Sequence, residues 1–96
     1  MHARVTRFKA DPARVDEGIR TINENVVPHA KKLAGFKGGY WLLDRKTGVG
    51  FSVTIFDNEA ALQASEEAAK QIREQAASSG ATQITGVERY EVIAQG

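Results

Sequence analysis

The sequence predicts an α+β fold in which a four-stranded antiparallel sheet carries two helices on one face. Strand-like and helix-like segments follow one another in the order strand, helix, strand, strand, helix, strand. The two middle strands are joined by a polar turn of hairpin length, and each helix begins at a residue that can cap it. Two split strand–helix–strand units in this order fold as one sheet with both helices on the same side.

The first strand and the first helix occupy the N-terminal third of the chain. Residues 2–9 alternate in the way that a half-buried strand requires. Asp11 can cap free backbone N–H groups, and Pro12 is well tolerated at the first helical position. Pro28 lacks a donor, so we expect the helix to kink or restart there before Gly35 ends it. The apolar stripe of this helix is Val15, Ile19, Ile22 and Val26.

A hairpin is expected over residues 36–56. Residues 36–44 and 49–56 alternate as strands, and the turn at 45–48 ends in a glycine that can adopt a positive φ. The odd-numbered face of the second of these strands is apolar: Val49, Phe51, Val53 and Ile55. Its even-numbered face is smaller and hydroxylated, apart from Phe56: Gly50, Ser52, Thr54 and Phe56. We expect the odd face to pack on the helices and the even face to point away from them.

The C-terminal part of the chain supplies the second helix and the last strand. Asp57 or Asn58 can cap the helix, whose apolar stripe is broken near Ser65, where a second helical segment begins. Residues 83–94 predict a strand with two faces of nearly equal polarity. Which side of this strand is buried stays open.

Composition limits the classes of protein to which the chain can belong. The 96 residues suit a single domain, residues 1–96, and 42% of them are hydrophobic. A net charge of +1 gives no basic excess for general nucleic-acid binding. The chain has no cysteine, no apolar leader and no apolar run of the ~20 residues that span a bilayer. We therefore expect a cytoplasmic protein with no nucleic-acid or membrane partner.

An uncovered sheet face predicts a partner. The even-numbered face of residues 49–56 continues into Phe8 on the first strand and into Trp41 and Leu43 on the second. If this face is open, it exposes a large apolar patch of Phe8, Trp41, Leu43 and Phe56. A second copy packed sheet against sheet would cover that patch, which predicts a homodimer through the open sheet face. Small and hydroxylated residues between the rings would leave an internal space for a small apolar or aromatic ligand. The alternative is an ordinary solvated sheet face, and both interpretations stay open.

The candidate pocket-lining residues are Arg4, Thr6, Trp41, Ser52, Thr54, Phe56 and His29. Arg4 could stabilise a phenolate or a carboxylate, or it could pair with a glutamate such as Glu88. Trp41 could stack on a planar ligand, although packing alone also explains it. His29 could act as acid, base or ligand, but a histidine near a helix end more often makes a local surface hydrogen bond. No residues stand at metal-ligand spacing, so no metal is expected.

RNA-recognition domains share this element order and are the main alternative class. The segment T-G-V-G-F-S-V-T (47–54) superficially resembles their glycine-aromatic strand motif, but Val49 stands where a base-stacking ring is needed. The near-zero net charge also argues against RNA. A ligand-sensing regulatory module of the same topology is a further alternative.

Three segments resemble the antibiotic-biosynthesis-monooxygenase-like superfamily: G-F-K-G-G-Y (35–40), F-S-V-T-I-F-D-N (51–58) and E-A-A-L-Q-A-S (59–65). The resemblance implies a ferredoxin-like subunit, a dimeric α+β barrel, and cofactor-independent oxidation of a small aromatic or quinol substrate. It gives no catalytic residue, since the asparagine and the helical histidine of the haem-degrading branch have no counterpart here. The alternative function is a non-catalytic, ligand-binding or stress-related dimeric barrel.

Overall fold

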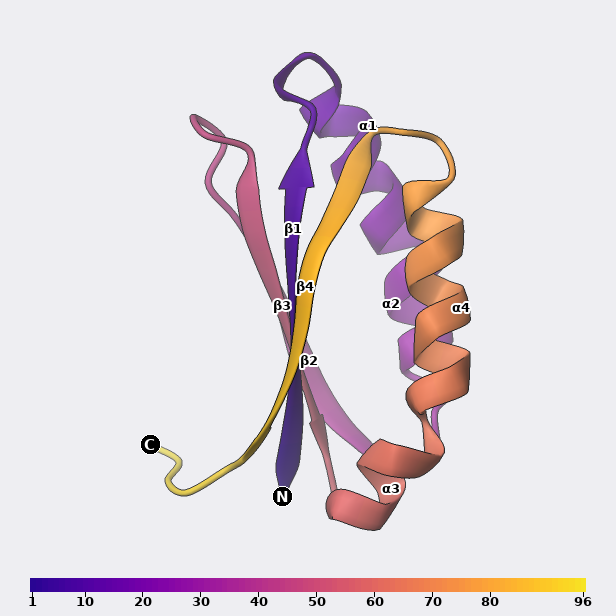
Figure 1. Ribbon diagram of the computed structural model, residues 1–96, viewed down its shortest axis with the longest axis vertical. Coiled ribbons are helices and arrows are strands. Elements are labelled where there is room, and N and C mark those ends of the chain that lie inside the picture. The colour runs from indigo at the N-terminus through magenta and orange to yellow at the C-terminus, as the bar shows by residue number, and fades with distance from the viewer.

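Four antiparallel strands form one sheet in the order β2–β3–β1–β4, and all helices lie on one side of it (Figure 1). The computed structural model describes all 96 residues. The elements are β1 (His2–Ala10), η1 (Pro12–Arg14), α1 (Val15–Thr21), η2 (Ile22–Val26), α2 (Val27–Ala30), β2 (Phe36–Leu43), β3 (Val49–Phe56), α3 (Glu59–Ala64), α4 (Glu66–Ala77) and β4 (Thr82–Glu91). This arrangement confirms the predicted α+β class and the ferredoxin-like subunit.

The first helical run changes its hydrogen-bonding pattern along its length. Asp11 caps its first turn as predicted, because its Oδ1 accepts from the backbone N–H of Ala13 at 2.9 Å. The run is α-helical in α1, π-helical in η2 and α-helical again in α2. Pro28 lies at the start of α2, where its missing donor does the least damage. The predicted restart at this proline is therefore confirmed, and Gly35 follows with a φ of 79°.

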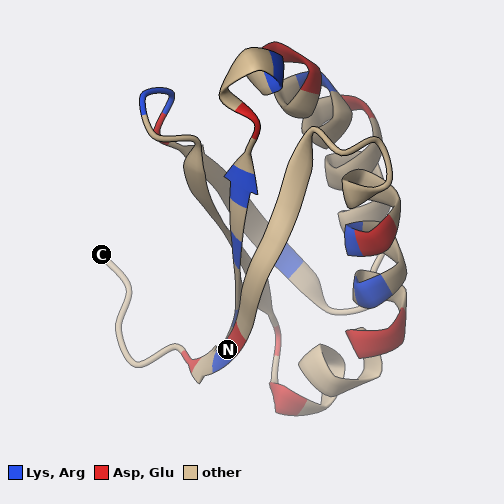
Figure 2. Ribbon diagram, turned by 45° about the horizontal axis from the view of Figure 1, so that its top comes forward, with Lys and Arg blue, Asp and Glu red and all other residues tan.

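The second helical run is divided where the sequence predicted. Asn58 is its cap, since its Oδ1 accepts from the backbone N–H of Ala61 at 2.8 Å. Ser65 separates α3 from α4, and its hydroxyl donates to the carbonyl of Leu62 at 2.7 Å. Neither run contains a helix with the length and apolar character that crossing a membrane requires. Figure 2 shows acidic and basic residues interspersed along the helices.

A register shift in β4 explains why its two faces look alike in sequence. Arg7 of β1 pairs with Gly86, but Phe8 pairs with Ile84, so Thr85 is an extra residue in the ladder. The inserted residue reverses the alternation, and Ile84 and Val87 therefore face the same side. β4 ends at Glu91, before the predicted end at residue 94.

The expected assignment of the sheet faces is wrong. The even-numbered face lies under the helices, where Arg4, Thr6 and Phe8 of β1 are buried. Ser52 and Phe56 of β3 are buried beside them. The other face combines the odd-numbered residues of β3 with Tyr40 and Leu42 of β2, since Tyr40 pairs with Val53 and Leu42 with Phe51. It points away from the helices and leaves these side chains exposed: Tyr40 (74%), Leu42 (51%), Val49 (43%) and Phe51 (38%).

The reversal has a steric cause. A Cβ atom on Gly50 would stand 2.4 Å from ring carbons of Phe8, so the small residue makes room for a large ring on the neighbouring strand. A Cβ atom on Gly39 would stand 3.3 Å from the ring of Trp41. Gly50 and Gly39 therefore leave room on the covered face for the rings of Phe8 and Trp41. The exposed apolar side chains of β2 and β3 lie on the face that no helix covers.

Candidate functional site

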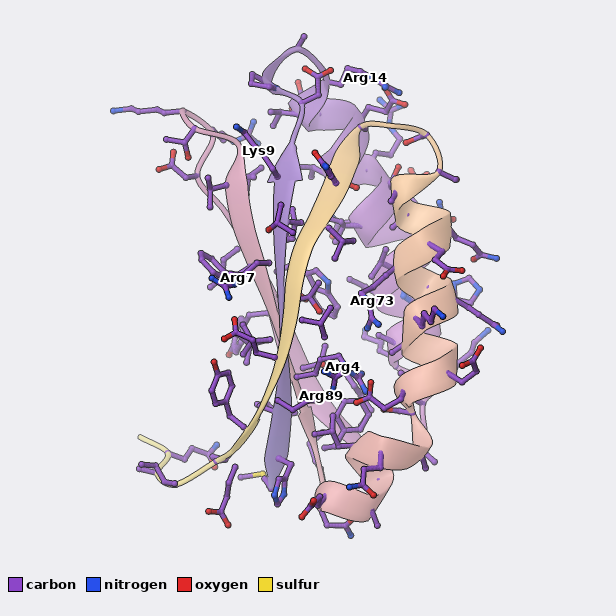
Figure 3. All side chains as sticks on the ribbon, viewed as in Figure 1. Arg4, Arg7, Lys9, Arg14, Arg73 and Arg89 are labelled. Atoms are coloured by element: carbon purple, nitrogen blue, oxygen red, sulfur yellow. The ribbon has the colours of Figure 1, made fainter.

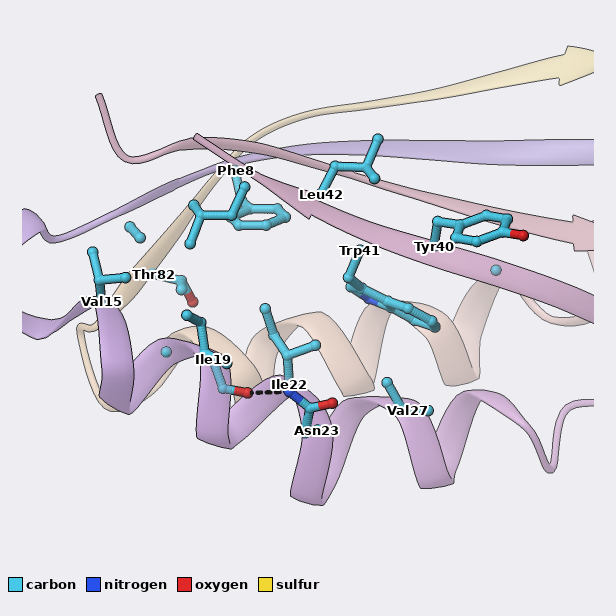
Figure 4. Close-up of a pocket in the computed structure, with 14 residues that line it drawn as sticks. Phe8, Val15, Ile19, Ile22, Asn23, Val27, Tyr40, Trp41, Leu42 and Thr82 are labelled. Atoms are coloured by element: carbon cyan, nitrogen blue, oxygen red, sulfur yellow. Dashed lines mark hydrogen bonds between the residues drawn. The ribbon is translucent and has the colours of Figure 1, made fainter. Parts of the chain in front are cut away.

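Three cavities lie in a row between the sheet and the helices. The largest has a volume of about 250 Å³ and is lined by 14 residues, of which 10 are hydrophobic. Two further cavities of about 50 Å³ each adjoin it, since neighbouring cavities share lining residues. Trp41 lines all three, and its indole points from β2 toward the helices (Figure 4). The large cavity has room for an aromatic ring, because benzene fits a cavity of about 150 Å³.

The wide end of the row is apolar. Ile19, Ile22 and Val27 line it from the first helical run, and Phe8 and Leu43 line it from the sheet. Its polar side chains are few, chiefly Asn23 and Thr82, and neither is ionisable. This end therefore suits an uncharged planar group.

The narrow end of the row is polar. Five of the seven predicted pocket residues line the cavity there: Arg4, Thr6, Trp41, Ser52 and Thr54. They meet beneath the helices, and not in a space on the open face of the sheet as expected. The alternation within each strand had grouped them correctly, because residues two positions apart in a strand point to the same face of the sheet. That they bind a ligand stays a prediction.

Phe56 and His29 do not line any of the three cavities. Phe56 is fully buried, and the guanidinium of Arg4 lies over its ring at 5.4 Å from the centroid. It therefore supports Arg4 and not a ligand. His29 is exposed, and its Nδ1 contacts the backbone oxygen of Asn25, which is the local surface interaction that its position favours.

Arg4 is fixed by the start of the second helical run. Only 3% of the residue is exposed, and its Nη2 donates to the carbonyl of Leu62 at 3.1 Å and to the hydroxyl of Ser65 at 2.8 Å. The same nitrogen donates to Oε1 of Glu66 at 3.0 Å. The suggested partner Glu88 is wrong, because it lies on the opposite face and pairs with Arg7 at 2.6 Å.

Glu66 links two arginines, Arg4 and Arg89. Arg89 donates to both of its carboxylate oxygens, at 2.8 and 2.6 Å, in addition to the contact from Arg4. The hydrogen bonds from Arg89 and then from Arg4 lower the pKa of Glu66 to about 2. This carboxylate therefore stays ionised and compensates part of the positive charge beside the cavity.

Arg73 is the functional candidate that the sequence did not reveal. It extends from α4 toward the sheet and lines both small cavities (Figure 3). Its Nη1 is buried and has no hydrogen bond partner. Burial, and then the charge of Arg4, lower its pKa. The available signal was helical spacing: Arg73 follows the buried Ala69 by four residues, which places it on the helix face that packs on the sheet.

The lining residues define what this site can do. Two guanidinium groups and three hydroxyls surround its narrow end, and no carboxylate or imidazole lines any of the three cavities. No group of three or more histidine, aspartate or glutamate residues in the chain could hold a metal. The arrangement can bind an apolar molecule that carries an anionic group.

No family model matches the chain. Two curated relatives, the uncharacterised proteins MT2635 and Rv2558 of Mycobacterium tuberculosis strains CDC 1551 and H37Rv, are each 32% identical over 77 residues. The match covers 80% of this chain and 33% of each relative. The chain thus spans about a third of the length of the curated relatives it matches.

Solved structures share the fold over the whole chain. HapK from Hahella chejuensis has a TM-score of 0.77 at 15% identity, covering 100% of this chain and 96% of its own. SnoaB, a cofactor-independent oxygenase from Streptomyces nogalater, has a TM-score of 0.72 at 12% identity, covering 98% and 94%. An antibiotic biosynthesis monooxygenase has a TM-score of 0.70 at 13% identity, covering 98% and 100%. The chain therefore has the fold of antibiotic-biosynthesis-monooxygenase-like proteins, and the predicted resemblance holds at this level.

Proposed function

We propose that this protein is a homodimer in which each subunit binds a small aromatic molecule between its sheet and its helices and oxidises it with O₂ and without a cofactor. The observation that carries the proposal is the row of cavities, apolar at its wide end and cationic at its narrow end. A phenol or quinol matches this distribution of polarity, because its ring is apolar and its ionised oxygen is negative.

The chemistry asks little of the protein. The electron-rich anion of an anthrone or quinol can react with O₂ directly, so the protein needs to bind the anion and stabilise its charge. For an anthrone, one oxygen atom becomes the new carbonyl group, the other leaves as water with the two methylene hydrogens, and the substrate supplies all the electrons. The arginines at the narrow end favour the ionised substrate through charge-assisted hydrogen bonds.

The open face of the sheet supports the dimer. Its exposed apolar residues on β2 and β3 form a continuous patch: Tyr40, Leu42, Val49 and Phe51. Arg7 and Glu88, which also lie on this face, pair with each other at 2.6 Å. A second copy packed by twofold symmetry would cover it with an identical patch.

A non-catalytic ligand-binding barrel is the second candidate function. The absence of any carboxylate or imidazole from the lining favours it, since no group there can remove a proton from a substrate that does not ionise by itself. In this case the same cavities would bind the same class of molecule without turnover.

Oxygen uptake distinguishes the two candidates. Wild-type protein, Arg73→Gln and Lys70→Gln are compared with a panel of anthrones and quinols. Lys70 lies on α4 and is exposed, so its substitution removes the same charge away from the cavities. We expect uptake by the wild type and by Lys70→Gln and a loss of at least tenfold in Arg73→Gln. Binding of these compounds without oxygen uptake would contradict the oxygenase and support the non-catalytic binding protein.

A further inference from the structure

Two buried N–H donors at the narrow end of the cavities lack partners. They are Nε of Arg4 and Nη1 of Arg73, which come from β1 and α4 respectively. Figure 3 shows both side chains between the sheet and α4. A buried donor without an acceptor is costly, and one on a charged group is more so. Their presence at one cavity indicates a missing acceptor.

The charges around this cavity are unbalanced in the same direction. Arg4 and Arg89 share the single carboxylate of Glu66. None of the seven ion pairs in the chain includes Arg73. An anion would satisfy both donors and would offset the positive charge of the arginines around this cavity.

We propose that the anion is the carboxylate of an aromatic acid, with one oxygen on Arg4 Nε and the other on Arg73 Nη1. Two donors on two separate residues can each contact one of the two oxygens of a carboxylate, and both contacts would be charge-assisted. The cavity of about 50 Å³ exceeds the roughly 10–15 Å³ that one water needs, so it has room for a small polar group.

The body of the ligand is fixed by what adjoins the carboxylate site. The shared wall of Trp41 leads to the cavity of about 250 Å³, whose lining is mainly hydrophobic. We propose a fused two-ring acid with its rings beside the indole and its carboxylate at the arginines. The inference rests on the proposed function, because it assigns the substrate class of the same cavities.

Isothermal titration with 2-naphthoate and its neutral analogue 2-naphthamide tests the assignment. We expect wild-type protein to bind the acid at least tenfold more tightly than the amide. Arg73→Gln should lose this preference and bind the amide unchanged, since the amide needs no cation. Lys70→Gln should keep the preference, which separates the buried arginine from general charge on α4.

Two outcomes would overturn the proposal, and they are distinguishable. Equal affinity of the wild-type protein for acid and amide would contradict the carboxylate site, but not ligand binding in the apolar cavity. Failure to bind either compound removes the carboxylate site together with the proposed function. Thermal unfolding of Arg73→Gln checks that the variant is folded, and we expect no large decrease in its melting temperature because Arg73 takes part in none of the ion pairs of the chain.

Discussion

The two faces of the sheet differ in how their side chains are covered. The face under the helices carries the rings of Phe8 and Trp41 beside glycines, hydroxyls and the buried Arg4, while the face without helices carries Phe51 and other exposed apolar residues. On the covered face, cavities remain between the rings and the small and hydroxylated residues. An open face that is apolar requires something to cover it. We therefore propose the ligand for the covered face and the second subunit for the open one.

The steric contrast predicts the largest effect. Gly50→Val should destabilise the fold by about 4 kcal/mol, because its Cβ would stand 2.4 Å from the ring of Phe8 and 2.7 Å from the carbonyl oxygen of Leu42. Gly38→Ala on the open face has no atom within 4 Å of the new Cβ and should be nearly neutral. Urea unfolding of both variants checks this, and equal destabilisation would contradict the role of Gly50.

Two arginines on the same strand contrast the faces electrostatically. Arg4→Ala should cost about 3 kcal/mol, because it removes a buried guanidinium and one of the two partners of Glu66. At a protein concentration at which the subunit is monomeric, Arg7→Ala should cost less than about 1 kcal/mol, because the Arg7 side chain is 50% exposed there and its ion pair is screened by water. Chemical denaturation measures both, and a larger loss for Arg7→Ala would reverse the assignment of the faces.

The open face predicts a change of oligomeric state. Phe51→Glu should weaken dimerisation at least a hundredfold, about 2.7 kcal/mol, because each subunit would bury an unpaired charge against the other. Gln71→Glu adds the same charge to the exposed surface of α4 and should leave the dimer intact. Light scattering over a dilution series measures both, and a wild type that is monomeric at high concentration would remove the dimer.

The smallest expected effect is a dependence of stability on pH. The folded-state pKa of Glu66, about 2, lies below its ordinary value of 4.5. The unfolded chain therefore takes up a proton first as the pH falls, and the stabilisation present above about pH 4.5 is lost between 4.5 and 2. Because the side chain is 30% exposed, we expect about 1 kcal/mol. Melting temperatures of wild type and Glu66→Gln should converge in this range, and parallel curves would contradict it.

Much of the fold could be predicted from local signals, because each acts over a few residues. The capping by Asp11, the break at Ser65 and the bounds of β3 all follow from such signals. The face that the helices cover could not, because alternation separates two faces without saying what packs on either. Size complementarity between Phe8 and Gly50 across two strands decided it.

The candidate site was predicted in part for the same reason. Parity along β1 and β3 grouped Arg4, Thr6, Ser52 and Thr54, and that grouping survives the reversal of the faces. Arg73 comes from a helix packed across the cavity, so no property of the strands could select it. Its unpartnered nitrogen exists only in the folded chain.

The central claim is that the covered face binds the ligand and the open face binds the second subunit. A crystal structure of the wild-type protein with 2-naphthoate tests it most directly. We expect the rings beside Trp41 beneath the helices, the carboxylate at Arg4 and Arg73, and the open faces of two subunits packed on each other. Naphthoate held between two open sheet faces, with the cavities beneath the helices unfilled, would contradict it.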